Sequence, residues 1–400
     1  MNHLVEHADL AVRERARALI DLRRELHREP ELAFAETRTA ERVASRLEAS
    51  GLGVRRGVAG TGVIAHLQGA RPGPIVAWRA DLDALPIEEP RGLPFASEIR
   101  GVMHACGHDG HAAIGVTVAE VLAAHRGELA GSVVFLFQPA EEVFGGAARM
   151  ITEGALTAPS VESVYGLHLT THLPPGVVSI GPGVMWAAAD LFEIELIGRG
   201  AHGAYPHLGR NPLLAAANLV TALQGLVAQT VAASDTAVLS IGYLRGGERP
   251  NVIPERAVLG GSLRTLSEDA RATLKARIEG ASRALADSHE VRARVTFTSS
   301  CPSVRNDPAR AETARRCARA VLGAAAVAPG QPSLASDDVA VFLEARPGCY
   351  FRAGIGPDAG PASAHHSPEF VMNEAGLMPA ARVALRILLD ATGSAHAVET

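Results

Sequence analysis

Segments with helical periodicity and segments with strand periodicity alternate along the first half of this chain, and this alternation restricts the fold more than any other feature. Helical patterns cover residues 8–27, 36–51 and 110–125. Between and after them lie the strand patterns "GVIAHL", "PIVAWRADLD", "GSVVFLFQ" and "SVYGLHL". The run "GSVVFLFQ" is continuously apolar, which is typical of a strand covered on both faces. The alternation predicts an α/β domain in which helices flank a mixed sheet.

The hydropathy pattern of the strands changes near residue 188 and interrupts this alternation. The strands that follow alternate apolar and polar residues, and helical patterns cover 211–231 and 268–286. Their order predicts a compact β-α-β-β-α-β unit of the ferredoxin-like, α+β type. The α/β pattern resumes near residue 301. Because 400 residues exceed one ordinary core, we expect two domains, with residues 188–300 inserted into a domain made of residues 1–187 and 301–400.

Charge and cysteine usage exclude several classes of protein. The net charge is −5, and the lysines and arginines form no basic block, so the sequence predicts no nucleic-acid partner. No apolar run reaches the roughly 20 residues that a membrane span needs, so we expect no membrane partner. The four cysteines are too dispersed for a disulfide framework, and the N-terminal segment is charged. These features predict a cytoplasmic protein.

The stretch "MHACGHDGH" (103–111) concentrates possible metal ligands in the turn that enters a helix. Cys106 and His108 are two residues apart and can reach one point in space. A thiolate with an imidazole suits zinc or a neighbouring first-row metal. The alternative is a buried free cysteine with helix-capping histidines. His111 shares a helix face with His108, and is as well suited to supporting or capping as to ligation.

Further ligand-type residues stand at other strand ends. Glu141 and Glu142 follow the buried strand "FLFQ", where one carboxylate can bind a metal while the other acts as a base. The alternative is an acidic pair at a solvated helix start. His168 ends a short apolar strand, and His365 and His366 occupy a turn before Ser-Pro. Five candidates are too many for one tetrahedral ion and suit a pair of ions: Cys106, His108, Glu142, His168 and His366.

At this point the chain resembles a known family, the metal-dependent aminoacylase and carboxypeptidase amidohydrolases. The resemblance is to the branch of hippurate hydrolases, N-acyl-amino-acid hydrolases and auxin-conjugate hydrolases. It runs nearly end to end and rests on ordered motifs: "HREPELAFAET", "ADLDALPIEE", "MHACGHDGH", "QPAEEVFGGA", "GLHL", "GRGAHGAYPH", "NVIPE", "GGSLRT" and "HHSPEF". It implies that the outer domain is catalytic and binds metal, and that the inserted domain serves as lid and dimerisation domain.

The resemblance also implies roles for individual residues. Cys106 would bridge two metal ions, and the ligand set would be completed by His108, Glu142, His168 and His366. Glu141 would be the general base and acid, and Asp83 would support a ligand from behind. The implied cofactors are two divalent ions, zinc or manganese first and cobalt or nickel as alternatives.

In the inserted domain, the resemblance assigns three residues to the substrate. His202 would stabilise the oxyanion, either from a partner subunit or after lid closure. Asn251 and Arg264 would hold the free carboxylate of the substrate, a task suited to an amide and a guanidinium. The use of His202 in trans implies a homodimer or larger homo-oligomer.

Together these features predict a binuclear metal-dependent amidohydrolase. Its substrates would be N-acyl or N-aroyl amino acids or small conjugates, cleaved at the amide by a water that loses its proton to Glu141. Alternatives within the same fold are a dipeptidase or carboxypeptidase, and a non-catalytic metabolite-binding homologue. A different chemistry, a thiol amidase with Cys106 as nucleophile and no metal, is a further alternative.

Overall fold

A computed structural model describes residues 3–90 and 92–396 of the chain, which form two compact units. The first unit comprises the chain up to Met185, Arg305–Gln331 and the chain from Asp338 onward. The second comprises Trp186–Val304 and Pro332–Asp337. The sequence analysis placed residues 332–337 in the outer domain, and this assignment was wrong. The segment belongs with the second unit because the Ala187 N–H donates to the carbonyls of Ser333 and Ala335, at 3.0 and 2.9 Å.

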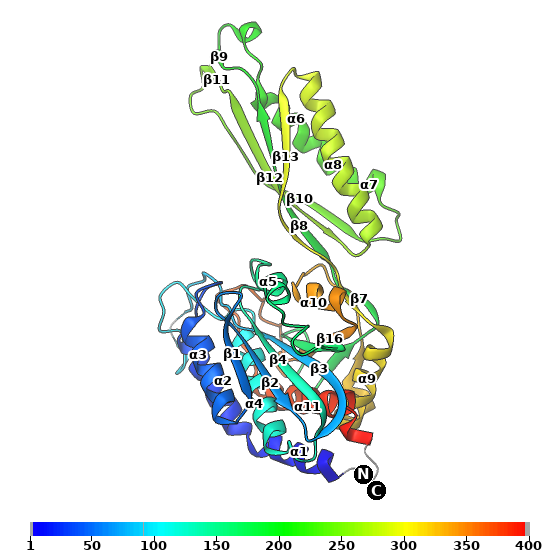
Figure 1. The fold of residues 1–400 in the computed structure, drawn as a ribbon. Helices are drawn as coiled ribbons and strands as arrows, with labels where there is room; N and C mark the ends of the chain where they lie inside the picture. Colours follow the sequence, from blue (N-terminus) through cyan, green and yellow to red (C-terminus); the bar gives the residue numbers. More distant parts are fainter. Residues whose placement is uncertain (1–2, 91, 397–400) are drawn as a thin grey trace. The chain divides into compact units, whose positions relative to one another are not determined.

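A mixed eight-stranded sheet forms the centre of the first unit (Figure 1). Its strands, in spatial order, are β1 (Gly53–Val58), β2 (Gly62–Gln68), β4 (Ala130–Gln138), β3 (Arg71–Asp81), β5 (Ser163–Thr170), β16 (Gly348–Gly354), β6 (Val178–Ile180) and β15 (Val327–Pro329). The four central strands β4, β3, β5 and β16 are parallel to one another. Two short strands, β7 (Gly183–Trp186) and β14 (Val304–Asn306), pair where the chain passes between the units.

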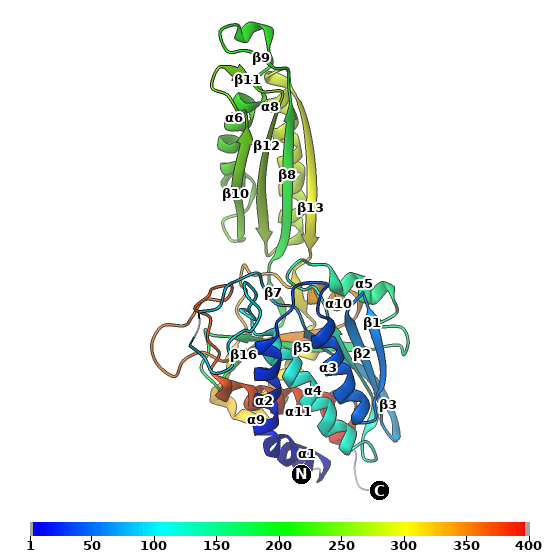
Figure 2. The same ribbon diagram turned by 90° about the vertical axis from the view of Figure 1, so that its left-hand side faces the viewer.

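Helices pack on this sheet and confirm the predicted α/β class (Figure 2). They are α1 (His3–Glu14), α2 (Ala16–Arg28), α3 (Thr37–Ala49), α4 (His108–Ala124), α5 (Gly146–Thr152), α9 (Pro308–Leu322), α10 (Val339–Ala345) and α11 (Leu377–Ala391). The single helix predicted over 8–27 is wrong, because the chain turns at Arg15. The turn lets α1 pack against α11 and α4 while α2 packs against α4.

Helix α4 is the central helix of this unit and is buried along nearly its whole length. Its apolar residues pack with the β4 side chains Val133, Phe135 and Phe137 in one continuous core. A helix that is apolar all round can lie only in such an interior. This packing fixes the N-terminal end of α4, where Cys106 and His108 stand, relative to the ends of the central strands.

The second unit is a four-stranded antiparallel sheet covered by helices. The strands, in the order β10 (Ala237–Gly246), β12 (Arg256–Thr265), β8 (Ala188–Ile197) and β13 (Arg292–Cys301), have the ferredoxin-like arrangement with helices α6 (Pro212–Gln224), α7 (Leu226–Thr230) and α8 (Glu268–Ser288). The single helix predicted over 211–231 is wrong, because Gly225 separates α6 from α7. A short ribbon pairs β9 (Ala201–His202) with β11 (Val252–Ile253).

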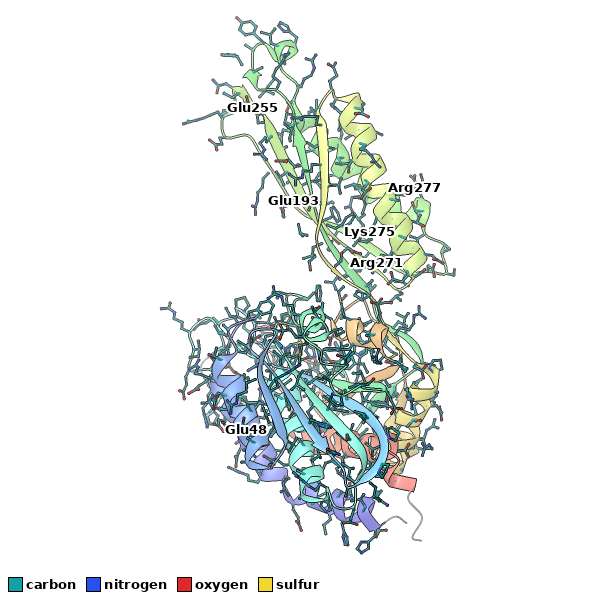
Figure 3. All side chains as sticks on the ribbon, in the orientation of Figure 1. Glu48, Glu193, Glu255, Arg271, Lys275 and Arg277 are labelled. Carbon is teal, nitrogen blue, oxygen red and sulfur yellow. The ribbon has the colours of Figure 1, made fainter. Side chains whose placement is uncertain are left out.

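A buried carboxylate fastens α8 to this sheet. Asp190 on β8 accepts bonds from the guanidinium of Arg271 at 2.7 and 3.0 Å and from the ammonium of Lys275 at 2.9 Å. Both cations lie on α8 (Figure 3). In the described part of the chain, no helix combines the length and apolar character needed to cross a membrane.

Candidate metal centre

The candidate ligands meet at the carboxyl edge of the central parallel strands. Strands β3, β4 and β5 run in the same direction, so the residues that follow or end them share one edge of the sheet. Asp83, the Glu141–Glu142 pair and His168 arrive there from these three strands. Gly107, in the left-handed region at φ +95°, turns the chain into α4 beside them.

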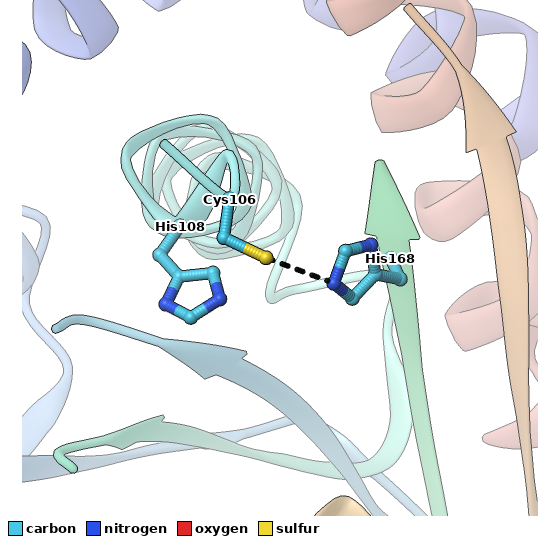
Figure 4. A group of neighbouring side chains, drawn as sticks. All are labelled: Cys106, His108 and His168. Atoms are coloured by element: carbon cyan, nitrogen blue, oxygen red, sulfur yellow. Dashed lines mark hydrogen bonds between the residues drawn. The ribbon is translucent and has the colours of Figure 1, made fainter. Parts of the chain in front are cut away.

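Two groups of ligand atoms overlap at this edge, and they share one thiol. The ligand atoms of Cys106, His108 and His168 lie within 4.8 Å of one another. The same holds for Cys106, Glu142 and His366. Cys106 Sγ lies 3.5 Å from His168 Nε2 and points from the start of α4 toward β5 (Figure 4). The structure therefore brings all five predicted ligands together, with Cys106 common to both groups.

Hydrogen bonds on the far side of two imidazoles orient them toward the centre. His108 Nδ1 donates to the Asp83 carbonyl at 2.9 Å, and His168 Nδ1 donates to the Leu169 carbonyl at 2.6 Å. Because a carbonyl only accepts, Nδ1 carries the hydrogen in both rings, and in the neutral form of each ring Nε2 keeps its lone pair for a ligand bond. Asp83 thus supports His108 through its main chain, whereas its carboxylate accepts the Glu142 N–H at 2.9 Å.

Several buried polar atoms at the centre lack ordinary hydrogen bonds. Among the described residues these include His108 Nε2 and Glu142 Oε1. His108 Nε2 lies 3.9 Å from Glu141 Oε2 and 3.8 Å from Glu142 Oε1, and His366 Nε2 lies 3.2 Å from Glu142 Oε1. An unpaired buried polar atom is costly, so these convergent atoms need a partner that all of them can bind. Sulfur, imidazole nitrogen and carboxylate oxygen are the donors that divalent first-row metals accept.

The electrostatics of the centre favour positive charge. The neighbouring Cys106 thiol and Glu142 carboxylate raise the pKa of His366 to about 10. Burial lowers the pKa of His108, but the Asp81 carboxylate and the neighbouring Cys106 together raise it by more. The pKa of His108 therefore lies above its usual value. Burial, reinforced by the Glu142 carboxylate, raises the pKa of the Cys106 thiol. The carboxylates therefore create a negative potential that suits bound cations.

The next histidine of the cluster, His111, is engaged at both ring nitrogens. Its Nδ1 donates to Asp81 Oδ1 at 2.6 Å, and its Nε2 accepts the Leu169 N–H at 2.9 Å. No lone pair remains for a metal, so His111 supports the site. Asp81 is in turn held by the buried Arg79 guanidinium at 2.6 Å. The sequence analysis missed Arg79 and Asp81, although two charged residues inside the apolar strand "PIVAWRAD" were a usable signal.

The two histidines before Ser-Pro differ in position. The His366 N–H donates to the Ala105 carbonyl at 2.9 Å, which ties this turn to the cysteine loop. Its φ of +57° is in the left-handed region and directs the ring toward Glu142. His365 instead packs on Phe370, with ring centroids 5.0 Å apart, and burial lowers its pKa to about 3. Of the pair, only His366 falls in a group of candidate ligands.

The three residues assigned to the second unit fall at two places in that unit. His202 and Asn251 are neighbours, because Val252 pairs with His202 and the Gly203 N–H donates to the Asn251 carbonyl. Arg264 pairs with Ala189 in the four-stranded sheet, at the end of β12 that is far from the β9–β11 ribbon. Between the Arg256 end and Arg264 the strand advances eight residues, about 26 Å. The second unit therefore does not bring Arg264 together with His202.

Comparison with known proteins places this site in context. Residues 77–390 match the model of peptidase family M20/M25/M40. N-acetyl-L-cysteine deacetylase of Bacillus subtilis (strain 168) is 38% identical over 363 residues, 90% of this chain and 85% of that protein. IAA-amino acid hydrolase ILR1-like 2 of Arabidopsis thaliana is 36% identical over 360 residues, 89% of this chain and 81% of that protein. The Bacillus subtilis YXEP protein, described as a dinuclear metal binding peptidase from the M20 family, superposes with a TM-score of 0.82 at 32% identity, covering 96% and 99% of the two chains.

The shared fold and the paired ligand groups define a metal-dependent hydrolase of amide bonds, whose site suits two divalent ions. The chain belongs to peptidase family M20/M25/M40. The resemblance drawn from the ordered motifs is thereby confirmed.

Proposed function

We propose that this enzyme cleaves the amide bond of N-acyl or N-aroyl amino acids, or of small related conjugates. The observation that carries the proposal is the pair of ligand groups that share Cys106 beside the buried carboxylate of Glu141. Support for the substrate class comes from relatives named for hydrolysis of N-acetyl-L-cysteine and of an IAA-amino acid.

In this proposal Cys106 would be the ligand shared by two divalent ions. His108 and His168 would complete one set of ligands, and Glu142 and His366 would complete the other. The shared thiolate, the three available imidazole nitrogens and the carboxylate fit zinc or manganese, with cobalt or nickel as alternatives. When bound, such a pair lowers the pKa of a coordinated water and polarises the carbonyl of the substrate.

Glu141 is the proposed proton carrier. Its side chain is nearly buried, and Oε2 lies 3.9 Å from His108 Nε2, so the carboxylate faces the centre without being needed as a ligand. Glu141 accepts the proton of the attacking water and returns it to the departing amine. Asp83 keeps this geometry by holding the His108 ring and the Glu142 main chain.

We further propose that the second unit serves as a lid and dimerisation domain. The Ala204 N–H donates to His202 Nδ1 at 3.0 Å, so Nε2 carries the ring hydrogen and can donate to an oxyanion. Asn251 and Arg264 are proposed to hold the carboxylate of the substrate. Because Arg264 lies at the end of β12 opposite to the β9–β11 ribbon that carries His202, closure of a single chain cannot unite them. A second copy that supplies both His202 and its neighbour Asn251 resolves this, so the proposed oligomer is a homodimer.

An exposed sheet edge is the proposed contact for that second copy. Strand β10 is the end strand of its sheet, and among the described residues no strand pairs with its outer side. Its side chains Val238, Tyr243 and Leu244 are exposed, and an open groove of about 630 Å³ lies between β10 and α6. An apolar, unpaired edge is the kind of strand that pairs with another chain.

The test is a screen of N-acetyl, N-benzoyl and indoleacetyl amino acids with added zinc, manganese, cobalt or nickel, followed by amine release. We expect Glu141→Gln to lower kcat by about 10²–10⁴-fold while both ions stay bound. If Glu141→Gln cleaves every substrate at the wild-type rate, the assignment of the base is wrong.

A second variant separates this mechanism from a thiol amidase. Cys106→Asp keeps a possible bridging ligand but removes the nucleophilic sulfur. Metal-dependent activity that survives in Cys106→Asp would support the metal-dependent mechanism. Full activity of the wild type after complete removal of metal would refute it.

We also propose a cytoplasmic location, because the four buried cysteines form no disulfide in the described part of the chain.

A further inference from the structure

The turn that carries Glu141 and Glu142 is backbone-strained. Ala140 and Phe144 are left-handed, at φ +54° and +53°, and neither is glycine. The turn is also tight: a Cβ added at Gly146 would lie 1.7 Å from the Pro139 carbonyl oxygen. Conformations of this kind persist only where the surroundings hold them. Some group outside the turn must therefore keep Glu141 in place.

Glu36, from the motif "HREPELAFAET", supplies such a group. Its side chain is fully buried, and Oε1 accepts the Ala140 N–H at 2.8 Å, while Oε2 accepts the Thr61 hydroxyl. On the other flank of the base, Asp83 accepts the Glu142 N–H at 2.9 Å. Two buried carboxylates thus hold the main-chain N–H groups on either side of Glu141.

An acid at the start of a helix ordinarily caps it, but the Glu36 side chain does not cap α3. Glu36 occupies the N-cap position of α3, but its side chain makes no capping bond. Another acid of the same motif does so: the Glu31 carboxylate accepts the N–H groups of Arg38 and Thr39 at 3.2 and 2.8 Å. With the start of α3 satisfied by Glu31, the Glu36 carboxylate is directed into the protein interior toward Ala140.

The rest of the motif also packs against the same turn. The Phe34 ring abuts Gly145, where an added Cβ would lie 2.8 Å from Cζ, and the Arg149 guanidinium stands 4.3 Å above that ring. The Glu31 carbonyl accepts the Ala84 N–H at 2.8 Å, directly after Asp83. The N-terminal segment thus braces both strand ends that carry Asp83 and the glutamate pair.

We infer that Glu36 is a positioning residue for Glu141, acting through the main chain of Ala140 and not by contact with substrate. The inference rests on the proposed function, in which Glu141 is the base. Small displacements of a catalytic group have large effects, since a shift of about 1 Å can cost on the order of a hundredfold in rate. Loss of the Ala140 bond should therefore appear in kcat.

Three variants of the full-length, metal-loaded enzyme test this. Glu36→Asp keeps the charge but shortens the reach, Glu36→Gln keeps an acceptor oxygen at the original distance, and Glu31→Ala removes the neighbouring carboxylate that only caps α3. We expect Glu36→Asp to lower kcat by about 10–100-fold with KM and bound metal little changed. Glu36→Gln should stay within about threefold of the wild type, because a neutral acceptor still meets the Ala140 N–H. Glu31→Ala should keep kcat and lose stability.

Hydrogen exchange supplies a readout besides activity. Glu36→Asp should speed exchange of the Ala140 amide by about tenfold or more, and Glu31→Ala should not. The inference is overturned if Glu36→Asp keeps the wild-type kcat and Ala140 protection, if Glu36→Gln is as impaired as Glu36→Asp, or if the loss of kcat follows loss of metal. Wild-type activity of Glu141→Gln would instead overturn the assignment of the base, and the exchange measurement would still test the Glu36 contact.

Discussion

Replacing His111 by leucine tests whether metal affinity at this centre depends on a residue that cannot itself be a ligand. The His111 ring joins helix α4 to strand β5, with Nδ1 on Asp81 and Nε2 on the Leu169 N–H. It also stacks on His108, with ring centroids 5.4 Å apart. Leucine fills most of the volume but offers neither a donor nor an acceptor.

The size of the effect follows from the two bonds that are lost. Both are buried, and one involves a carboxylate, so their loss costs about 2–4 kcal/mol of stability. Asp81 keeps its bond to Arg79 at 2.6 Å, which favours the lower end of this range. The Leu169 amide adjoins His168, so without its bond to His111 the end of β5 that carries His168 becomes more mobile. This mobility should also weaken metal binding by about 10–100-fold.

The assay is competition with a chromophoric chelator for zinc, together with thermal unfolding. His125→Leu is the matched control, since that histidine lies at the opposite end of α4 and its ring donates to the Val121 carbonyl, at 2.9 Å. We expect the control to bind zinc like the wild type. If His111→Leu also binds zinc with wild-type affinity, the supporting role of this ring is refuted.

Further predictions concern the second unit. Asp190→Ala should lower the free energy of unfolding of this unit by about 3–5 kcal/mol, because two cations lose a buried partner. Glu268→Ala removes only an exposed partner of Arg271 and should cost under about 1 kcal/mol. Urea unfolding measures both changes. Burial raises the pKa of Asp190, but bonds from Arg271 and its neighbours hold it below its usual value. This stabilisation is present above the unfolded pKa of about 3.9 and is lost as pH falls through the lower folded pKa. The difference in free energy of unfolding between the wild type and Asp190→Asn should therefore become smaller on acidification. A difference that stays constant with pH would contradict this. If the protein forms the proposed dimer through β10, Leu244→Asp should shift its sedimentation to that of a monomer. An unchanged sedimentation profile would reject β10 as the contact.

Sequence patterns predicted the element types well where the packing of each element is uniform. The continuous apolar runs of β4 and of α4 correspond to burial in a single core. The predicted helices over 8–27 and 211–231 failed for a different reason. Each is interrupted by a turn, at Arg15 and at Gly225, that divides it into two helices. Helical periodicity does not report such a change of direction.

The candidate ligands could be found from the sequence because each stands at the end of a strand or in a turn. Strand ends of a parallel sheet meet at one edge, so Glu142 and His168 were predictable neighbours of Cys106. The support around them was not predictable. Glu36 contacts a residue 104 positions away and His111 one 58 positions away, through hydrogen bonds that depend on sub-ångström placement.

The amino-acid sequence by itself determined the chemistry available to this protein: the donor types, their order along the chain and the alternation that builds the sheet. These are local properties of residues and of their periodicity. Only the tertiary structure decided which ring nitrogen is free, which carboxylate holds the strained turn, and that Arg264 and His202 lie apart within the second unit. Hydrogen-bond direction and distance arise from packing between distant segments, and no local pattern encodes them.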